Sequence, residues 1–178
     1  MKRVVVLGRG GAGKSVLAQK LSCRLDIPVT ELDSIFWKPG LRPTPEPDWA
    51  EIQRKLIARD RWIIDGDLGP YDSGLELRLG AADTVIVLDF PLCRCAWRAL
   101  RRSRETREFW MWVYRYRRNS LPAIREAIAT RAPHATVHIL HNPRQVRRLV
   151  DGSRGGIGSG TVALARGITR CFGPGRSA

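Results

Sequence analysis

The stretch that decides the fold is Gly8-Arg9-Gly10-Gly11-Ala12-Gly13-Lys14-Ser15. It fits the Walker A pattern of glycine, any four residues, glycine, lysine and serine without a mismatch. The glycines of such a loop let the main chain curl so that successive amides point at phosphate oxygens, and the following helix adds its positive end. Lys14 would bridge the β- and γ-phosphates of ATP, and Ser15 would place its hydroxyl on a Mg²⁺ ion. The stretch therefore predicts a site for ATP and Mg²⁺.

The residues on both sides of this loop predict the context that a phosphate loop needs. The run Val4–Leu7 before it is apolar throughout, which is typical of a buried strand. After it, Leu17, Leu21 and Leu25 recur every four residues, so one stripe of the following helix can pack on a sheet. Strand, loop and helix in this order favour a nucleotide-binding P-loop over the alternative, a glycine-rich turn with a fortuitous lysine.

Short apolar runs along the chain predict one parallel sheet. The runs expected to form its strands are Arg3–Leu7, Val29–Leu32, Trp62–Asp65, Thr84–Leu88 and Thr136–Leu140. Because these runs are nearly all apolar and alternate with helical stretches, we expect a three-layer α/β fold with helices on both faces of the sheet. We expect a single domain over residues 1–150.

Two helical regions are predicted between these strands. Asp48 and Glu51 have the spacing of a capping box, so a helix is expected to begin near Asp48, after the proline-rich loop 38–47. The basic stretch 91–131 is also predicted to be helical. Breaks in it are expected near residues 103–107 and again near residues 120–122.

The end of the chain divides into a helix and a tail. Asn142 and Pro143 follow the last predicted strand and have the residue types of a helix cap and a first helical position. This helix is expected to fade at Val150. The range 151–178 is rich in glycine and arginine and is expected to be largely disordered.

The overall composition narrows the class of partner and the compartment. The chain carries 31 basic and 17 acidic residues, a net charge of +14. Such an excess attracts nucleotides, nucleic acids and acidic membranes alike, so it does not choose among them. The early apolar run ends at Gly8, too short for a signal-peptide core, so we expect a cytoplasmic protein with no membrane partner and reduced cysteines. Neither the cysteines nor the histidines have zinc-site spacing.

Asp89 is the first carboxylate candidate for the metal. It ends the run Val85–Asp89, where a nucleotide hydrolase or kinase usually keeps a residue that holds Mg²⁺ through water. Its alternative role is to cap a helix beginning at Pro91. Ser15 and Asp89 are therefore the predicted metal-site residues.

Four further carboxylates follow the second and third predicted strands. Glu31 and Asp33 alternate, so on a strand they would share a face near the phosphate loop. One would orient or deprotonate an acceptor hydroxyl while the other helps with the metal, the alternative being a cap for the next turn. Asp65 and Asp67 flank a glycine, which indicates either the lining of an acceptor pocket or an ordinary turn.

The stretch 94–118 is more basic than expected for a surface without a binding role. Its arginines are Arg94, Arg98, Arg101, Arg102, Arg104, Arg107, Arg115, Arg117 and Arg118. In a phosphoryl-transfer enzyme, arginines close over the triphosphate and stabilise the charge that spreads during transfer. Aromatic residues between them are also typical of single-stranded nucleic-acid binding. Because Phe109, Val113 and Tyr116 recur at helical spacing, a core role is favoured for most of these aromatics.

Together these features resemble the adenylate-kinase-like branch of P-loop kinases, and most closely the small proteins labelled DNA topology modulation proteins. The resemblance runs from Met1 to about Val150. Besides the loop, it is carried by Leu32-Asp33 with Phe36-Trp37, Trp62–Gly66, Ala82–Thr84 and Asn142–Arg144. Adenylate kinases proper have Asp-Gly-x-Pro-Arg after the third strand, where this chain reads Asp65-Gly66-Asp67-Leu68-Gly69-Pro70. Their AMP site is therefore not carried over.

The resemblance implies a five-stranded parallel sheet of order 2-3-1-4-5, ATP and Mg²⁺ as cofactors, an acceptor-binding region over about 33–62 and an arginine-rich lid over about 94–118. The residues then expected to hold the nucleotide are Gly8, Gly10, Gly11, Ala12, Gly13, Lys14, Ser15, Val16 and Asn142.

Two functional hypotheses follow. The first is a phosphotransferase that moves the γ-phosphoryl group of ATP to a small nucleotide, nucleoside or hydroxylated metabolite. Its predicted catalytic residues are Lys14, Asp33, Arg98, Arg102 and Arg104. The second is an ATP-binding regulatory or nucleic-acid-binding protein with little kinase activity, whose basic helices contact phosphates.

Overall fold

A parallel five-stranded sheet forms the centre of the computed structural model, which describes residues 1–102 and 106–153. β1 (Arg3–Gly8) is central and pairs with β5 (Trp62–Asp65) and β6 (Thr84–Leu88). β2 (Val29–Glu31) and β7 (Thr136–Leu140) form the two edges. The order β2-β5-β1-β6-β7 confirms the predicted order 2-3-1-4-5 of the main strands.

The apolar character of β1 explains why the sheet is covered on both sides. Successive side chains of a strand point to opposite faces. Val5 and Leu7 belong to one buried cluster, and Val4 and Val6 belong to a second cluster on the other face. Burying each such side chain contributes about 1.5–3 kcal/mol, so the central strand stabilises both halves of the core.

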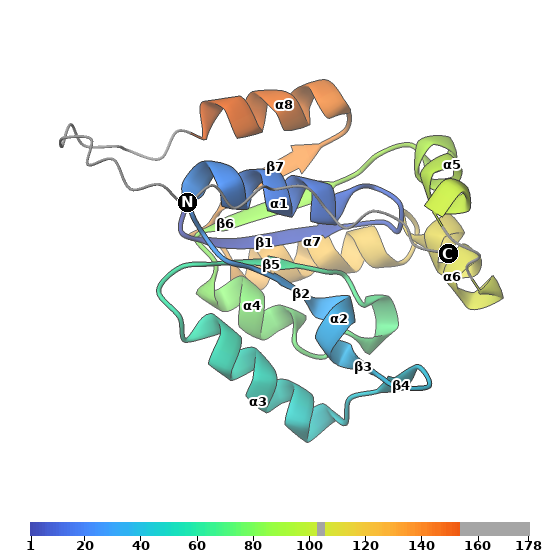
Figure 1. Cartoon of the computed structure of the whole chain (residues 1–178), viewed down its shortest axis with the longest axis horizontal. Coiled ribbons are helices and arrows are strands. Elements are labelled where there is room, and N and C mark those ends of the chain that lie inside the picture. Colours follow the sequence, from blue (N-terminus) through green and yellow to red (C-terminus); the bar gives the residue numbers. More distant parts are fainter. Residues whose placement is uncertain (103–105, 154–178) are drawn as a thin grey trace, which may run out of the picture.

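Helices cover both faces, as Figure 1 shows. One face holds α1 (Lys14–Leu25) and α8 (Pro143–Gly152), and the other holds α3 (Glu46–Ile57), α4 (Leu75–Ala81) and α7 (Ser120–Arg131). Leu17 and Leu21 are buried under the first of these layers, which confirms the predicted stripe of α1. Within the described residues, no helix has both the length and the apolar character that a membrane span needs.

The basic stretch forms α5 (Leu92–Arg102) and α6 (Arg107–Arg115), which lie together beyond one end of the sheet in Figure 1. The first predicted break, near residues 103–107, falls largely on residues 103–105, which lie outside the described residues, and Thr106 then caps α6. The second break lies earlier than predicted, between Arg115 and Ser120. Pro122 falls in the first turn of α7, where a missing amide hydrogen costs nothing.

Several short elements depart from the predictions. The helix expected near Asp48 begins at Glu46, so Asp48 is not its cap, and Glu51 pairs with Lys55 instead. β2 ends at Glu31, because α2 (Leu32–Phe36) starts immediately after it. The loop 38–47 contains part of a small hairpin of β3 (Trp37–Lys38) and β4 (Arg42–Pro43), and η1 (Gly69–Tyr71) precedes α4.

The end of the described chain agrees with the predicted helix start. Asn142 caps α8 by accepting a hydrogen bond from the Gln145 amide at 3.0 Å, and Pro143 is its first residue. The helix ends at Gly152, two residues beyond Val150, where it was expected to fade. The tail predicted to be disordered lies outside the described residues from position 154 onward.

Candidate functional site

The glycine-rich loop joins β1 to α1 at the carboxyl edge of the sheet. Gly11 has φ of 76° and Gly13 has φ of 96°, a left-handed conformation that favours glycine. A Cβ atom at Gly11 would collide with the main-chain oxygen of Cys95, and one at Gly13 would come within 2.9 Å of the Arg98 guanidinium. The loop can therefore curl under α5 only because these residues have no side chain.

Lys14 and Ser15 open α1 and direct their polar groups toward the neighbouring strand end. The Lys14 ammonium donates to the Gly8 carbonyl at 2.9 Å, so it spans the loop from one end to the other. The Ser15 hydroxyl makes a hydrogen bond with the carboxylate of Asp65, the last residue of β5. The loop and the end of β5 thus form one polar cluster.

Asp65 is the buried carboxylate of this cluster. It is 3% exposed, and its Oδ1 has no hydrogen-bond partner among the described residues. Burial raises the pKa of Asp65, while Lys14 and the Ser15 hydrogen bond lower it. The sequence analysis named Asp65 as possible lining of an acceptor pocket or part of a turn, but did not connect it with Ser15, because Asp-Gly is also an ordinary turn signal. Its position at the end of a fully buried strand was the signal that could have found it.

Glu31 and Asp33 lie beside Asp65, although the predicted geometry was wrong. Glu31 pairs with Asp65 in the β2–β5 register, but Asp33 lies in the first turn of α2 and not on the strand. Repulsion from both carboxylates adds to the effect of burial in raising the pKa of Asp65. Both side chains are exposed, so they are open to a ligand at this edge.

Asp67 connects the same strand end to the basic helices. Its Oδ2 accepts a hydrogen bond from the hydroxyl of Tyr116 at 2.9 Å, and its Oδ1 accepts one from the Gly69 amide at 3.1 Å. Burial raises the pKa of Asp67, and the Lys14 charge opposes that shift. An ordinary turn, the alternative given for this segment, explains the hydrogen bond to Gly69 but not the hydrogen bond to Tyr116.

Asp89, the predicted metal-site residue, is held by different neighbours. Its Oδ1 accepts a hydrogen bond from Arg117 Nε at 2.8 Å, and its Oδ2 lies 3.4 Å from His141 Nδ1. The side chain is buried after the end of β6. The metal role of Asp89 stays a prediction, but Asp65 is the carboxylate hydrogen-bonded to Ser15.

The donors at this edge fit a magnesium nucleotide. A hydroxyl, a carboxylate oxygen without a partner and a glycine cradle are the groups that the phosphates and their Mg²⁺ use in such loops. Within residues 1–102 and 106–153, no group of three or more His, Cys, Asp or Glu side chains is arranged to hold a metal ion by itself.

The predicted lid arginines are described only in part. Arg98 Nη1 donates to the Ala12 carbonyl at 3.4 Å, so α5 brings this cation to the phosphate loop. The side chain of Arg102 and the whole of Arg104 lie outside the described residues. Arg98 is the predicted catalytic arginine that the structure brings to the loop.

Arg9, which the sequence analysis did not assign, lies buried within the loop itself. It is 2% exposed, and its guanidinium lies 5.6 Å from the centre of the Tyr116 ring. Its Nε and Nη1 have no hydrogen-bond partner among the described residues. Phe109 of α6 also contacts the loop, since a Cβ atom on Gly10 would lie 2.5 Å from its ring. The loop is thus covered by the basic helices.

The remaining predicted nucleotide contacts, Ala12, Val16 and Asn142, have less defined roles. Val16 is exposed in the first turn of α1, and Ala12 is buried in the loop. Asn142 is exposed and uses its side-chain oxygen to cap α8. Contact of Val16 and Asn142 with a nucleotide stays a prediction.

Aromatic rings gather in the predicted acceptor region. Phe36, at the end of α2, packs edge-on against Trp37 at 4.8 Å and against Trp49 at 4.9 Å between ring centres. Tyr71 packs edge-on against Trp37 at 5.5 Å. Trp49 is buried, whereas Tyr71 is exposed and Trp37 is half-buried. The cluster therefore has a buried base and an accessible rim.

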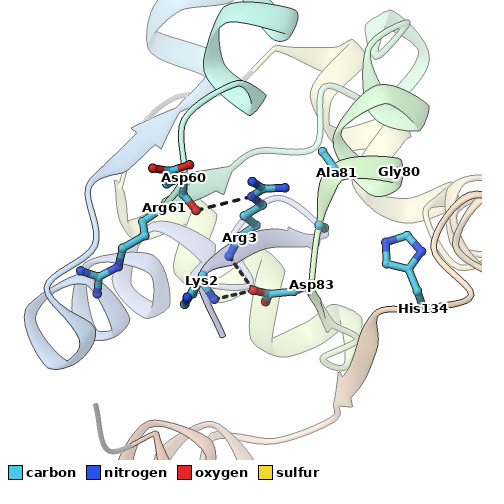
Figure 2. Close-up of a pocket in the computed structure, with 9 residues that line it drawn as sticks. Lys2, Arg3, Asp60, Arg61, Gly80, Ala81, Asp83 and His134 are labelled. Atoms are coloured by element: carbon cyan, nitrogen blue, oxygen red, sulfur yellow. Dashed lines mark hydrogen bonds between the residues drawn. The ribbon is translucent and has the colours of Figure 1, made fainter. Parts of the chain in front are cut away.

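A separate cavity of about 630 Å³ lies at the opposite edge of the sheet (Figure 2). Its lining includes Lys2, Arg3, Asp60 and Asp83, which stand at or just before the starts of β1, β5 and β6. Asp83 accepts hydrogen bonds there from the main-chain amides of Lys2 and Arg3 at 2.6 and 3.0 Å. Ligands of open parallel sheets bind at the carboxyl ends of the strands, so this cavity is distinct from the loop site.

No protein-family model and no curated protein matches the sequence. The structure is similar to a shikimate kinase from Acinetobacter baumannii solved with shikimate, with a TM-score of 0.58 and 17% identity over 85% of this chain and 90% of that one. A sugar kinase from a Janibacter species gives 0.52 and 18% over 85% and 93%. A shikimate kinase from Bacteroides thetaiotaomicron gives 0.51 and 17% over 85% and 95%. These likenesses show the P-loop kinase fold.

Proposed function

We propose that the chain is an ATP-dependent phosphotransferase that moves the γ-phosphoryl group to a small acceptor. The observation that carries the proposal is the single cluster in which Lys14 spans the glycine loop and Ser15 is hydrogen-bonded to Asp65. This cluster combines a phosphate cradle, a cation for the transferring group and a buried carboxylate at the adjacent strand end. The fold, shared with solved small-molecule kinases, is consistent with this activity.

Each residue has a defined task in the proposed reaction. The loop amides and Lys14 bind the triphosphate, and Arg98 adds positive charge from α5. Ser15, backed by Asp65, would hold Mg²⁺, which neutralises charge on the phosphates when bound. Asp33 would orient the acceptor hydroxyl or take its proton. Arg102 and Arg104 complete the proposed set of catalytic residues.

The proposed division of the chain follows from these positions. Residues 1–150 form the catalytic domain, 33–62 bind the acceptor and 94–118 cover the phosphates. The half-buried Trp37, packed against Tyr71, is consistent with acceptor binding in the region 33–62. The hydrogen bond from Arg98 to the loop is consistent with a phosphate-covering role for the stretch 94–118. The acceptor remains one of three kinds: a nucleotide, a nucleoside or a hydroxylated metabolite.

The test is ADP release from ATP and Mg²⁺ in the presence of nucleoside monophosphates, nucleosides, sugars and shikimate. Lys14→Ala should lower acceptor-stimulated ADP release by about 100-fold or more, because it removes a cation that stabilises the transferring group. Lys20→Ala, an exposed position on the same helix, is the matched control and should behave as wild type. An active Lys14→Ala protein would rule out the mechanism.

A second candidate function rests on two exposed aromatics of the basic helices. Trp97 is 61% exposed and Tyr114 is 63% exposed, and the Arg101 guanidinium lies 5.1 Å from the Trp97 ring centre. Rings and arginines on one surface are typical of single-stranded nucleic-acid binding. We propose this surface as the site of the alternative, an ATP-binding regulator of the DNA topology modulation type.

Salt separates the two functions. Oligonucleotide binding through many phosphate contacts should weaken steeply between low and physiological salt, whereas binding of ATP and Mg²⁺ should change far less. Trp97→Ala should weaken oligonucleotide binding more strongly than it lowers acceptor-stimulated ADP release. ATP binding without stimulation by any acceptor, together with salt-sensitive oligonucleotide binding, would favour the regulatory function.

A further inference from the structure

Building on the proposed phosphotransfer, we infer that the acceptor is a polyhydroxylated ring compound without negative charge, such as a neutral sugar or a nucleoside. The acceptor must reach the γ-phosphate, which Lys14 is positioned to hold. The groups around Lys14 therefore define the chemistry that an acceptor meets. Four carboxylates lie at this edge: Glu31, Asp33, Asp65 and Asp67.

These carboxylates select ligands that donate hydrogen bonds. An ionised carboxylate only accepts hydrogen bonds, so its partners must be hydroxyl, amide or ammonium groups. Phosphate and carboxylate oxygens also only accept, so an anionic acceptor would be repelled and would gain no hydrogen bond here. Glu31 and Asp33 are exposed at this edge, where an acceptor can contact them.

A second observation concerns one oxygen atom at this edge. Asp65 Oδ1 is buried without a hydrogen-bond partner among the described residues, and such an atom is costly unless a ligand satisfies it. A hydroxyl or a metal-bound water can satisfy it, whereas an anionic oxygen cannot. The unpartnered atom and the exposed carboxylates thus favour the same kind of ligand.

The described cations near this edge either have acidic partners or lie at the phosphate loop. Arg9 and Arg98 belong to the loop, where the triphosphate would use their N–H groups. Arg78 is fully buried and makes two hydrogen bonds with Asp72, at 2.9 and 2.6 Å. Arg117 is paired with Asp89. Lys14 is the cation that acts most strongly on both Asp65 and Asp67, and the transferring phosphate requires it.

The aromatic rim indicates a ring-shaped acceptor. Trp37 follows α2, the helix that carries Asp33, and Tyr71 packs against it from η1. An exposed ring beside carboxylates offers an apolar surface for one face of a sugar or base and acceptors for its hydroxyl groups. A flexible, open-chain anionic metabolite would use neither feature.

The test is a panel of matched pairs that share a carbon skeleton and differ in charge. The pairs are glucose and glucuronate, ribose and ribose 5-phosphate, and adenosine and AMP. ADP release is measured with ATP and Mg²⁺, and equilibrium binding is measured by tryptophan fluorescence with a non-hydrolysable ATP analogue. We expect the uncharged member of at least one pair to bind at millimolar concentration and to exceed its anionic partner at least tenfold in kcat/KM.

A charge-removing variant tests the cause of this preference. Glu31→Gln should reduce the ratio of kcat/KM between the uncharged and the anionic member of a pair several-fold, because it removes an exposed negative charge at the acceptor edge. Glu31→Asp should retain this ratio. Glu126→Gln removes an exposed carboxylate from α7 and should change nothing.

The outcomes separate this inference from the proposed function. Turnover that favours the anionic members would overturn the inference and support the phosphotransferase. Preferential binding of an uncharged member without any transfer would support the inference about the site and overturn the phosphotransferase. Failure of all uncharged members to bind would overturn the inference, as would a preference that Glu31→Gln leaves intact.

Discussion

Two buried aspartates, Asp65 and Asp89, are candidates to support the proposed Mg²⁺ ion, and their neighbours distinguish them. Asp65 is hydrogen-bonded to Ser15, whereas Asp89 is held by Arg117. Loss of a residue that supports a metal ligand typically costs 10- to 100-fold in metal affinity or activity. We therefore expect Asp65→Asn to raise the Mg²⁺ concentration for half-maximal ADP release by about tenfold or more.

The matched variant for this prediction is Asp89→Asn. It should leave the Mg²⁺ requirement near that of wild type, because it alters the pairing with Arg117 and not the hydroxyl of Ser15. A Mg²⁺ titration of both variants at saturating ATP makes the comparison. If Asp89→Asn alone shifted the titration, the prediction from the sequence would hold and Asp65 would have another role.

Asp33 belongs to the acceptor side of the reaction. Removing a general base or an orienting carboxylate typically lowers the rate by about 10²- to 10⁴-fold. Asp33→Asn should therefore lower kcat by about 100-fold or more while the KM for ATP stays near its wild-type value. Steady-state kinetics with ATP and acceptor varied in turn provide the measurement. Weaker ATP binding at unchanged kcat would contradict the assignment.

The residues of the site could be predicted from the sequence where a local rule fixes them. The loop from Gly8 to Ser15 follows from spacing alone, because each position serves the curl of one short segment. Asp65 could not be separated from Asp89 in this way. Both aspartates end or follow a buried strand that pairs with β1, so the strand order does not separate them. Only the side-chain contacts of the folded chain place Asp65 with Ser15 and Asp89 with Arg117.

At the scale of elements, Tyr116 connects the end of α6 to the end of β5. Burial and the Asp67 charge raise the pKa of Tyr116, so its hydroxyl remains a donor to Asp67 at neutral pH. Tyr116→Phe leaves that buried carboxylate without its donor and should lower the free energy of unfolding by about 1–3 kcal/mol. Tyr114→Phe, at an exposed position, should change it by less than about 0.5 kcal/mol.

Urea unfolding of both variants at neutral pH provides the measurement. An unchanged stability of Tyr116→Phe would show that the hydroxyl is not required to satisfy Asp67. In that case the connection between α6 and β5 would depend on the apolar contacts of the ring alone.

A second connection joins α4 to the turn before it through a buried ion pair. Arg78 of α4 pairs with Asp72, and its Nη1 also donates to Gln53 of α3 at 3.2 Å. Asp72→Asn leaves a buried guanidinium without its counter-charge and should lower the free energy of unfolding by about 3–5 kcal/mol. Glu76→Gln, a change on the same helix as Arg78, breaks an exposed pair with Arg131 of α7 and should cost less than about 1 kcal/mol.

Comparison of the two variants by chemical unfolding separates a buried pair from an exposed one. Similar costs for both changes would contradict the structural role of Arg78. Because Asp72 also acts on Asp67, the ion pair lies close to the acceptor edge and is expected to stiffen it.

The elements predicted well are those with a complete apolar pattern. β5, β6 and β7 have the predicted bounds, since each is a short apolar run flanked by polar residues. The elements α2, η1 and α4 were missed. They are too short to show a helical repeat, and contacts with neighbouring elements decide their conformation.

At the scale of the whole molecule, the net charge of the chain does not predict the charge of the proposed acceptor site. The chain carries +14, yet the acceptor edge gathers carboxylates from β2, α2 and β5. Total charge describes attraction at long range, whereas the choice of acceptor depends on groups a few ångströms apart. The fold brings together acidic residues that are spread over more than thirty positions in the sequence, from Glu31 to Asp67.

Gathering these carboxylates should reduce the stability of the whole molecule at neutral pH. The pKa of Asp65 is raised in the folded state from 3.8, mainly by burial, so folding favours its protonated form. That contribution is fully present below the unfolded pKa and is lost as the pH rises through the folded pKa. Asp65→Asn removes the ionisable group, so the variant should be more stable than wild type at pH 7.

The difference in stability should shrink as the pH falls to about 4, where the wild-type carboxyl is increasingly protonated. Asp26→Asn is the matched control, because Asp26 is exposed and asparagine also tolerates its left-handed φ of 54°. Urea unfolding of all three proteins at both pH values tests this dependence. If Asp65→Asn is more stable than wild type but needs more Mg²⁺, the buried charge of Asp65 lowers stability and is kept because the activity needs it. If Asp65→Asn is less stable than wild type at pH 7, the predicted cost of the buried charge is wrong.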